Sequence, residues 1–257
     1  MLRKLFLAIG AAIAIGAPAQ TQLEIPDFTE AVQSTDSAEV EETATKYTGH
    51  PAIDAFINAP QTVFPTIDHM TRMDMADYFN SGSPKPSKNN FKGDCRIISA
   101  SDSQITLSTS DVSEVELSLL PMKSDTIIMV VTTLNTPVPD SDVKFYTYPG
   151  WAQVKEGVFI VPGLDDWTVK DTAVQREDLE NAVPFILARL SYKPETGQLI
   201  LENKLGDFLP KEANDLVNGA LKARLVYRWD GSRMVCFGIY FEIEATLEAR
   251  ALEVKQK

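Results

Sequence analysis

The sequence predicts an α+β protein in which helices precede runs of antiparallel strands. Apolar residues at helical spacing come before several short segments in which apolar and polar residues alternate, and turn-forming residues separate those segments. The same order occurs again in the second half of the chain. We therefore expect two tandem units, each made of one helix and an antiparallel meander; the sequence leaves open whether they share one continuous sheet.

The start of the chain is typical of a secretory signal peptide. Arg3 and Lys4 precede an apolar run over 5–16, and a small-residue site at 17–19 follows it. The run is too short to span a bilayer. We therefore expect residues 1–19 to be a signal peptide. After its cleavage we expect a soluble protein that is periplasmic or otherwise exported and has no transmembrane segment.

Charge limits the classes of partner. The chain carries a formal net charge of −12 at pH 7. Such a surface repels phosphate backbones and anionic lipid, so nucleic acid is not an expected partner. Residues 20–50 form an acidic leader, for which a flexible, solvated tether is favoured over an interaction tail because few apolar residues there offset the entropy of ordering.

The first α+β unit is expected at 51–170. It opens with a helical pattern over 51–80, which the turn residues at 80–84 end. The apolar stripe of this pattern consists of Phe64, Ile67, Met75, Tyr78 and Phe79. Alternating segments then predict strands at 96–99, 104–108, 115–119, 126–133 and 143–148.

The second unit is expected at 171–257. A helix over 174–188 is followed by strands at 190–192 and 198–202, by a helix-like segment at 211–219 and by a hairpin of 220–229 with 233–243. Asp230-Gly231 predicts that hairpin most clearly, since the pair supplies the positive φ angles that a two-residue turn needs.

The densest polar cluster lies on the first helix. Its members are Asp68, His69, Arg72, Asp74, Asp77 and Tyr78. Helical spacing allows an ion pair between Asp68 and Arg72 and places Asp74 and Asp77 on one face. Paired carboxylates are able to perform acid–base chemistry or to bind a hard cation. An ordinary helix with a surface salt bridge explains the same residues, and we favour it because no nucleophile accompanies them.

No motif predicts a catalytic residue, a metal or a cofactor. His50 and His69 are the only histidines and belong to no zinc pattern, and no serine-hydrolase, Walker A or dinucleotide motif occurs. Cys95 and Cys236 are the only cysteines. In an exported protein they are compatible with one disulfide or with two buried thiols.

Two further places carry candidate binding residues. Residues 132–142 read as a loop in which Asp140 and Ser141 either contact a ligand or fold the turn, and we favour the turn. Trp151 belongs to a group of aromatics able to line a groove for a peptide or a glycan, although aromatics on strands are more often core residues.

Several segments that contain these candidate residues resemble a family of uncharacterised exported proteins of Bacteroidetes, largely Bacteroidales. The segments that carry the resemblance are Phe64-Pro65, residues 72–78 with Gly82, Asn90 with Gly93, Thr136-Pro137 with Asp140-Ser141, and Phe145-Tyr146 with Trp151. The resemblance covers about 56–170 and implies export and an envelope location. It implies no catalytic residue, cofactor or substrate.

The sequence favours a non-catalytic binding or protein-interaction module whose partner is an unknown envelope protein or peptide. Sheet faces and edges suit such contacts. The alternative is an envelope hydrolase that uses His69, Arg72, Asp74 and Asp77, which requires these side chains to converge in one concave pocket.

Overall fold

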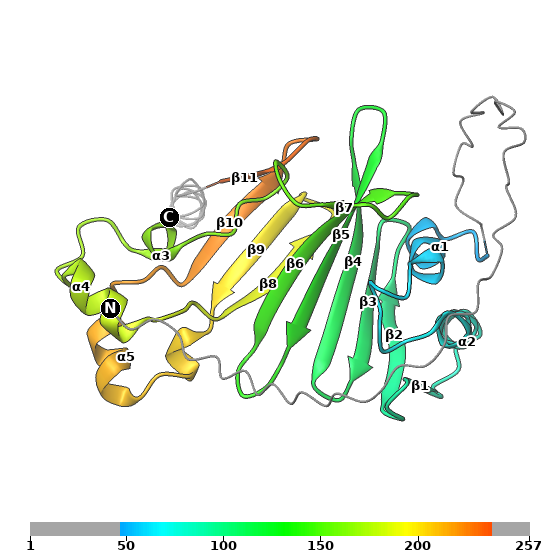
Figure 1. Cartoon of the computed structure of the whole chain (residues 1–257), viewed down its shortest axis with the longest axis horizontal. Helices are drawn as coiled ribbons and strands as arrows, with labels where there is room; N and C mark the ends of the chain where they lie inside the picture. Colours follow the sequence, from blue (N-terminus) through cyan, green and yellow to red (C-terminus); the bar gives the residue numbers. More distant parts are fainter. Residues whose placement is uncertain (1–46, 238–257) are drawn as a thin grey trace, which may run out of the picture. The chain divides into compact units, whose positions relative to one another are not determined.

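The structure, a computed structural model, describes residues 47–237 (Figure 1). It confirms the α+β class, with helices and two antiparallel sheets. The expected signal peptide, nearly all of the acidic leader and the last part of the expected 233–243 strand lie outside these residues. Within 47–237, no helix combines the length and the hydropathy needed to cross a bilayer.

The larger sheet is a seven-stranded meander in which each strand pairs with the next along the chain. Its strands are β1 (Ser87–Lys88), β2 (Asp94–Ala100), β3 (Gln104–Ser110), β4 (Ser113–Pro121), β5 (Thr126–Leu134), β6 (Asp140–Tyr148) and β7 (Gln153–Val154). The smaller sheet has the order β11-β10-β9-β8. Its strands are β8 (Ala188–Lys193), β9 (Gln198–Asn203), β10 (Arg224–Trp229) and β11 (Met234–Cys236). The two sheets are therefore not one continuous sheet.

Prolines divide the helical segments that the sequence predicts. In place of one helix over 51–80 there are two, α1 (Pro51–Asn58) and α2 (His69–Asn80). Ala59 is extended because Pro60 follows it, and a residue before proline avoids the helical region. For the same reason α4 (Arg176–Ala182) ends before Pro184, so the expected helix over 174–188 is shorter. The remaining helical elements are α3 (Leu164–Trp167), η1 (Leu205–Asp207) and α5 (Lys211–Val217).

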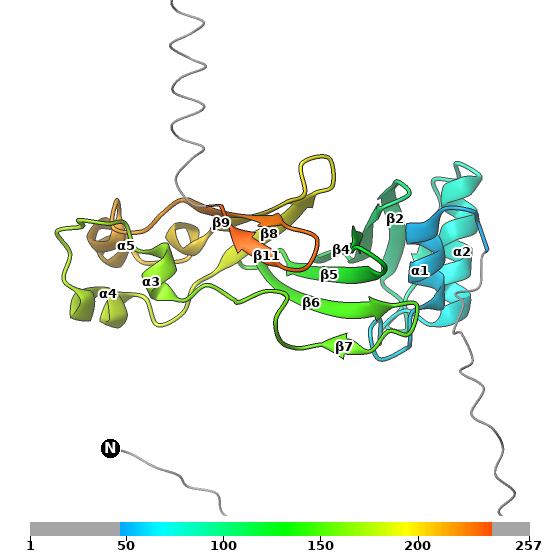
Figure 2. The same cartoon turned by 90° about the horizontal axis from the view of Figure 1, so that it is seen from above.

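The seven-stranded sheet has a different neighbour on each face, as the alternation along β5 shows. Ile128 and Val130 belong to the core that contains α1, whereas Met129 and Val131 belong to the core shared with the smaller sheet. Side chains of a strand point alternately to its two faces. The fold thus has a helical layer, the larger sheet and the smaller sheet, and Figure 2 shows α1 and α2 close to β2 and the smaller sheet close to β5 and β6.

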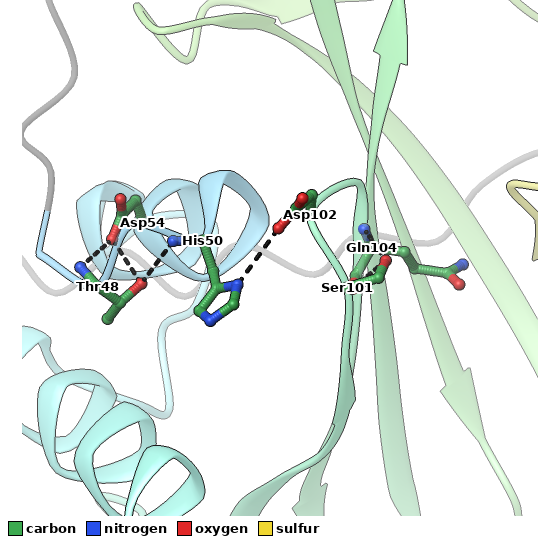
Figure 3. A network of polar contacts seen from close by, with 6 residues as sticks. All are labelled: Thr48, His50, Asp54, Ser101, Asp102 and Gln104. Atoms are coloured by element: carbon green, nitrogen blue, oxygen red, sulfur yellow. Dashed lines mark hydrogen bonds and ion pairs between the residues drawn. The ribbon is translucent and has the colours of Figure 1, made fainter.

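Helix α1 is enclosed on nearly all sides, because it packs against both the sheet and α2. Its residues from Ala52 to Ile57 are all buried, including Asp54. The Asp54 carboxylate accepts hydrogen bonds from the backbone N–H groups of Tyr47 and Thr48 and from the Thr48 hydroxyl, at 2.8–3.0 Å. Figure 3 shows Asp54 and Thr48 beside His50, whose Nδ1 lies 3.3 Å from a carboxylate oxygen of Asp102 in the β2–β3 turn.

The edge strand β8 is held by side chains of the larger sheet. The outward backbone N–H groups of Ala188, Leu190 and Tyr192 donate hydrogen bonds to Asp140, Ser141 and Glu116, respectively, at 3.0–3.1 Å. Gln104 Nε2 donates to the carbonyl of Tyr192 at 3.1 Å. Unpaired backbone groups at a sheet edge otherwise invite pairing with another chain. These side chains close the β8 edge and join the two sheets.

Glu116 gives the junction a testable pH dependence. Burial raises the pKa of the Glu116 carboxyl, with hydrogen bonding by Tyr192 acting in the opposite direction. The folded protein therefore binds this proton more tightly than the unfolded chain does, and stability falls as pH rises through the folded-state pKa. Because a glutamine side chain does not titrate, urea unfolding is expected to show Glu116→Gln gaining stability relative to wild type as pH rises above the ordinary pKa of a glutamate.

The acceptor of the Tyr192 N–H can be tested separately from the charge. Glu116→Leu leaves that buried N–H without a partner and is expected to lower the free energy of unfolding by about 1–3 kcal/mol. Glu114→Gln is the matched control, since Glu114 forms a half-exposed ion pair with Arg189 and its loss is expected to cost less than ~1 kcal/mol. Equal effects of Glu116→Gln and Glu116→Leu at pH 7 would contradict this account.

Candidate functional site

The polar residues at the start of α2 have structural roles, because they cap the helix and contact the preceding helix. Asp68 is the N-cap, and its carboxylate accepts a hydrogen bond from the backbone N–H of Thr71 at 2.8 Å. This bonding lowers the pKa of Asp68. His69 Nδ1 lies 3.1 Å from the carbonyl oxygen of Ile57, the next-to-last residue of α1. Asp68 therefore caps α2, and His69 links it to α1.

Arg72 is a buried anchor for the connection between α1 and α2. Its side chain is 2% exposed. Nη2 donates to the carbonyl of Ala59 at 2.7 Å, and Nη1 donates to the carbonyl of Ile67 at 3.1 Å. No ion pair joins Arg72 to Asp68 among residues 47–237, so the expected salt bridge is wrong. The guanidinium instead satisfies two carbonyls of a segment that prolines keep out of helical structure.

The other α2 candidates point to different surroundings. Asp74 and Asp77 are exposed, and Tyr78 is half-buried with Lys85 Nζ 5.4 Å from its ring centre. None of His69, Arg72, Asp74 and Asp77 lines either of the two grooves described below. The convergence that the hydrolase alternative requires is therefore not present in the described part of the chain.

Residues 140–151 are more structured than the sequence indicates. Strand pairing continues through Leu134↔Asp140, so only residues 135–139 connect β5 to β6, and the expected loop over 132–142 is wrong. The Asp140 and Ser141 side chains accept hydrogen bonds from the backbone N–H groups of Ala188 and Leu190 in β8. Trp151 is 7% exposed and packs against Tyr146 with ring centres 5.5 Å apart, which places it in the core.

A groove runs between α2 and the outer edge of β2, and we call it the β2 groove. It has a volume of about 420 Å³. It is lined by Met75, Tyr78 and Phe79 of α2, by residues 82–85 and 87, and by residues 95–98 of β2. Met75, Tyr78 and Phe79 share one helix face at spacings of three and four. Figure 1 shows α2, β1 and β2 at this end of the sheet.

The end of α2 builds the opposite wall. Gly82 has a φ of 67° and follows the helix, Gly82 N–H donates to the carbonyl of Phe79, and Ser83 N–H donates to that of Tyr78. This is the Schellman arrangement, in which glycine adopts the left-handed conformation at low cost. The chain then passes Pro84 and Pro86, which have no N–H to give to a strand ladder.

Those prolines leave most of the β2 edge open. β1 pairs with β2 only through Ser87↔Cys95 and Lys88↔Asp94. Beyond Cys95, residues 96–100 have no strand partner on this side within the described residues. Ile98, which lies at a register shift in the β2–β3 pairing, is 49% exposed.

Polar groups of the groove lack partners. Ser87 is 7% exposed, and its hydroxyl has no hydrogen-bond partner among residues 47–237. Lys85 and Arg96 form no ion pair within the same part of the chain, whereas Lys88 is paired with Asp94. Cys95 is a buried free thiol whose pKa burial raises to about 11, and Cys236 is a free, exposed thiol, so the two are not bridged.

A second groove of about 350 Å³ lies beside β6. Asp140, Ser141, Val161, Trp167 and Phe185 are among its lining residues. Two of its polar side chains already have partners, because Asp140 and Ser141 hold β8. The β2 groove is the better candidate, since its buried Ser87 hydroxyl has no hydrogen-bond partner and its two cations, Lys85 and Arg96, have no ion-pair partner among the described residues.

The comparisons place the chain in a family. A family model described as "Protein of unknown function (DUF3256)" matches residues 44–234. The chain belongs to this family. The expectation of an uncharacterised family is thereby confirmed, and a comparison with curated proteins gives no match.

One solved structure is similar in fold to this member of the family. It is described as a domain of an uncharacterized protein from Porphyromonas gingivalis W83, a member of the Bacteroidetes, with a TM-score of 0.60 and 24% sequence identity. The match covers 73% of this chain and 98% of that one. At this identity the likeness shows the fold alone.

Sequence reasoning identified Tyr78 but missed the groove around it. The open edge depends on where β1 stops, and β1 has only two residues, which is too short for a periodicity signal. Pro84 and Pro86, two residues apart just before a strand, are the available signal, because they exclude a continuous ladder along β2.

Arg72→Met tests the anchor. The substitution keeps an apolar stem of similar length but leaves two carbonyls without donors, so we expect a loss of about 3 kcal/mol in the free energy of unfolding. Asp77→Ala on the exposed side of the same helix is the control, with an expected change within about 0.5 kcal/mol. Urea unfolding of the full chain measures both. A loss below ~1 kcal/mol for Arg72→Met would show that the guanidinium is not an anchor.

Asp68→Ala tests the helix cap. Loss of an N-cap side chain costs about 1 kcal/mol, and Asp74→Ala serves as the matched control on the same helix. Because the pKa of Asp68 is lowered on folding, its contribution is present above the ordinary value and disappears as pH falls through the folded-state pKa. The difference between wild type and Asp68→Ala should therefore shrink in acid, and a difference that persists at about pH 2 would contradict the charged-cap account.

Proposed function

We propose that this protein is a non-catalytic binding module, exported to the cell envelope, whose β2 groove takes an extended segment of a partner protein. The signal-peptide pattern of residues 1–19 supports export. The observation that carries the binding function is the unpaired edge of β2 beside an apolar groove. An extended peptide adds to such an edge through main-chain hydrogen bonds, while side-chain pockets supply specificity.

The groove meets both requirements of strand addition. Residues 96–100 offer backbone donors and acceptors on the open side of the sheet. Tyr78 and Phe79, which are half-buried, and Ile98, which is exposed, offer apolar surface beside that edge. The buried Ser87 hydroxyl supplies a further hydrogen-bonding group without a partner in the described structure, and burial of such a group is costly unless a ligand satisfies it.

Backbone pairing is testable with a neutral probe peptide. The probe is fluorescein-labelled Val-Gln-Val-Gln-Val, with two variants N-methylated at the valines or at the glutamines. Only alternate N–H groups of an added strand face the edge, so one variant should lose at least about tenfold in affinity and the other should bind like the parent. Fluorescence anisotropy measures the three affinities.

Hydrogen exchange locates the probe on the protein. Bound peptide is expected to slow amide exchange at residues 96–100 and to leave residues 140–144 of β6, beside the second groove, unchanged. Equal binding of both N-methylated variants, protection of β6 in place of β2, or failure of the parent peptide to bind at millimolar concentration would each overturn the proposed function.

A further inference from the structure

We infer that the β2 groove selects an extended segment in which apolar and acidic residues alternate, with the carboxylates beside Arg96. This inference rests on the proposed function and names the chemistry of the partner. It follows from the exposure pattern of β2, the unpaired cations of the groove and the charge of the rest of the chain.

The alternation of β2 sets the alternation of its partner. Cys95 and Ile97 are buried on the helical side of the sheet, whereas Asp94, Arg96 and Ile98 are exposed on the other. A strand paired with β2 has the same period of two, so its side chains also alternate between the helical side and the open side. The helical side, with Tyr78 and Phe79, suits apolar side chains.

The open side suits carboxylates. Arg96 has no ion-pair partner among residues 47–237, while Asp94 on the same strand is paired with Lys88. Directly opposed charges of opposite sign stabilise a strand pair, and like charges destabilise it. Lys85, on the facing wall, adds a second cation that no described carboxylate neutralises. The groove is therefore locally cationic in a protein whose net charge is −12.

This charge pattern argues against a second copy of the chain as the occupant. Two β2 edges paired antiparallel by a two-fold axis would place the two Arg96 side chains in the same small interface. Cationic side chains on an edge strand are a common means of preventing such self-pairing. An acidic segment would instead place carboxylates beside Arg96, so the repulsion between two Arg96 side chains would not arise.

The net charge also makes the test sharp. Non-specific electrostatics of an acidic protein favour a basic peptide over an acidic one. The groove predicts the opposite order. We therefore compare three labelled peptides of equal length, Val-Glu-Val-Glu-Val, Val-Gln-Val-Gln-Val and Val-Lys-Val-Lys-Val, by fluorescence anisotropy at low and high salt.

The acidic peptide is expected to bind at least about tenfold more tightly than the basic one, with the neutral peptide between them, and the preference should fall at high salt. Arg96→Gln should remove most of the preference while leaving the affinity of the neutral peptide within about twofold. Arg224→Gln is the matched control, because Arg224 is an exposed arginine on β10 and its loss changes the net charge equally. It should leave the preference intact.

The outcomes separate the two proposals. If the neutral peptide binds and the acidic peptide binds no better, the charge selection is wrong while the binding function stands. If Arg96→Gln and Arg224→Gln reduce the preference equally, the selection does not come from the groove and the inference is overturned. If none of the peptides binds, the proposed function itself fails.

Discussion

The hydrogen bonding of β8 is the constraint on which the arrangement of the two sheets depends. An edge strand exposes a row of backbone groups, and here three of its N–H groups and one carbonyl are satisfied by side chains from β3, β4 and β6. Acceptors on separate strands fix the position of β8 against the larger sheet at several points. The apolar residues of β5, β6, β9 and β10 then fill the space between the sheets. The junction is thus directional as well as apolar, and it protects an edge that would otherwise pair with another chain.

The β2 edge has the opposite character. β1 covers it for two residues, and the prolines that precede β1 prevent further cover. No side chain of the described residues closes residues 96–100 as Asp140, Ser141 and Glu116 close β8. The two edges therefore differ, because side chains satisfy the backbone groups of β8 whereas residues 96–100 of β2 stay open beside an apolar groove. Stability of the fold alone does not require an open edge at β2. That difference is the physical basis of the binding function proposed for this family member.

The helical layer explains why the groove exists at all. Arg72 holds the connection between α1 and α2 by bonding carbonyls that no helix satisfies, and Asp68 sets the first residue of α2. The Schellman turn at Gly82 sets the last. Together they fix the length and position of α2, and therefore the distance between its apolar face and β2. The polar cluster of the first predicted helix contributes mainly through this positioning, while Tyr78 alone among those residues lines the groove.

The sequence by itself determined the α+β class, the meander order of the strands and most strand positions, because alternation of apolar and polar residues is a local property. It also placed the β10–β11 hairpin, but the two-residue Asp230-Gly231 turn is wrong, because the pairing ends at Trp229↔Met234 and only Gly231 has a positive φ, which leaves 230–233 as the connection. It did not give the break between α1 and α2, although Pro60 signals it, since the apolar stripe continues through Phe64 and Ile67, which are buried outside any helix. Only the tertiary structure decided that Arg72 bonds carbonyls and not Asp68, that Asp140 and Ser141 serve β8, and that Trp151 is a core residue. The β8 partners lie up to 88 residues away in the chain, and a pattern of neighbouring residues carries no information on which distant backbone group a side chain will meet.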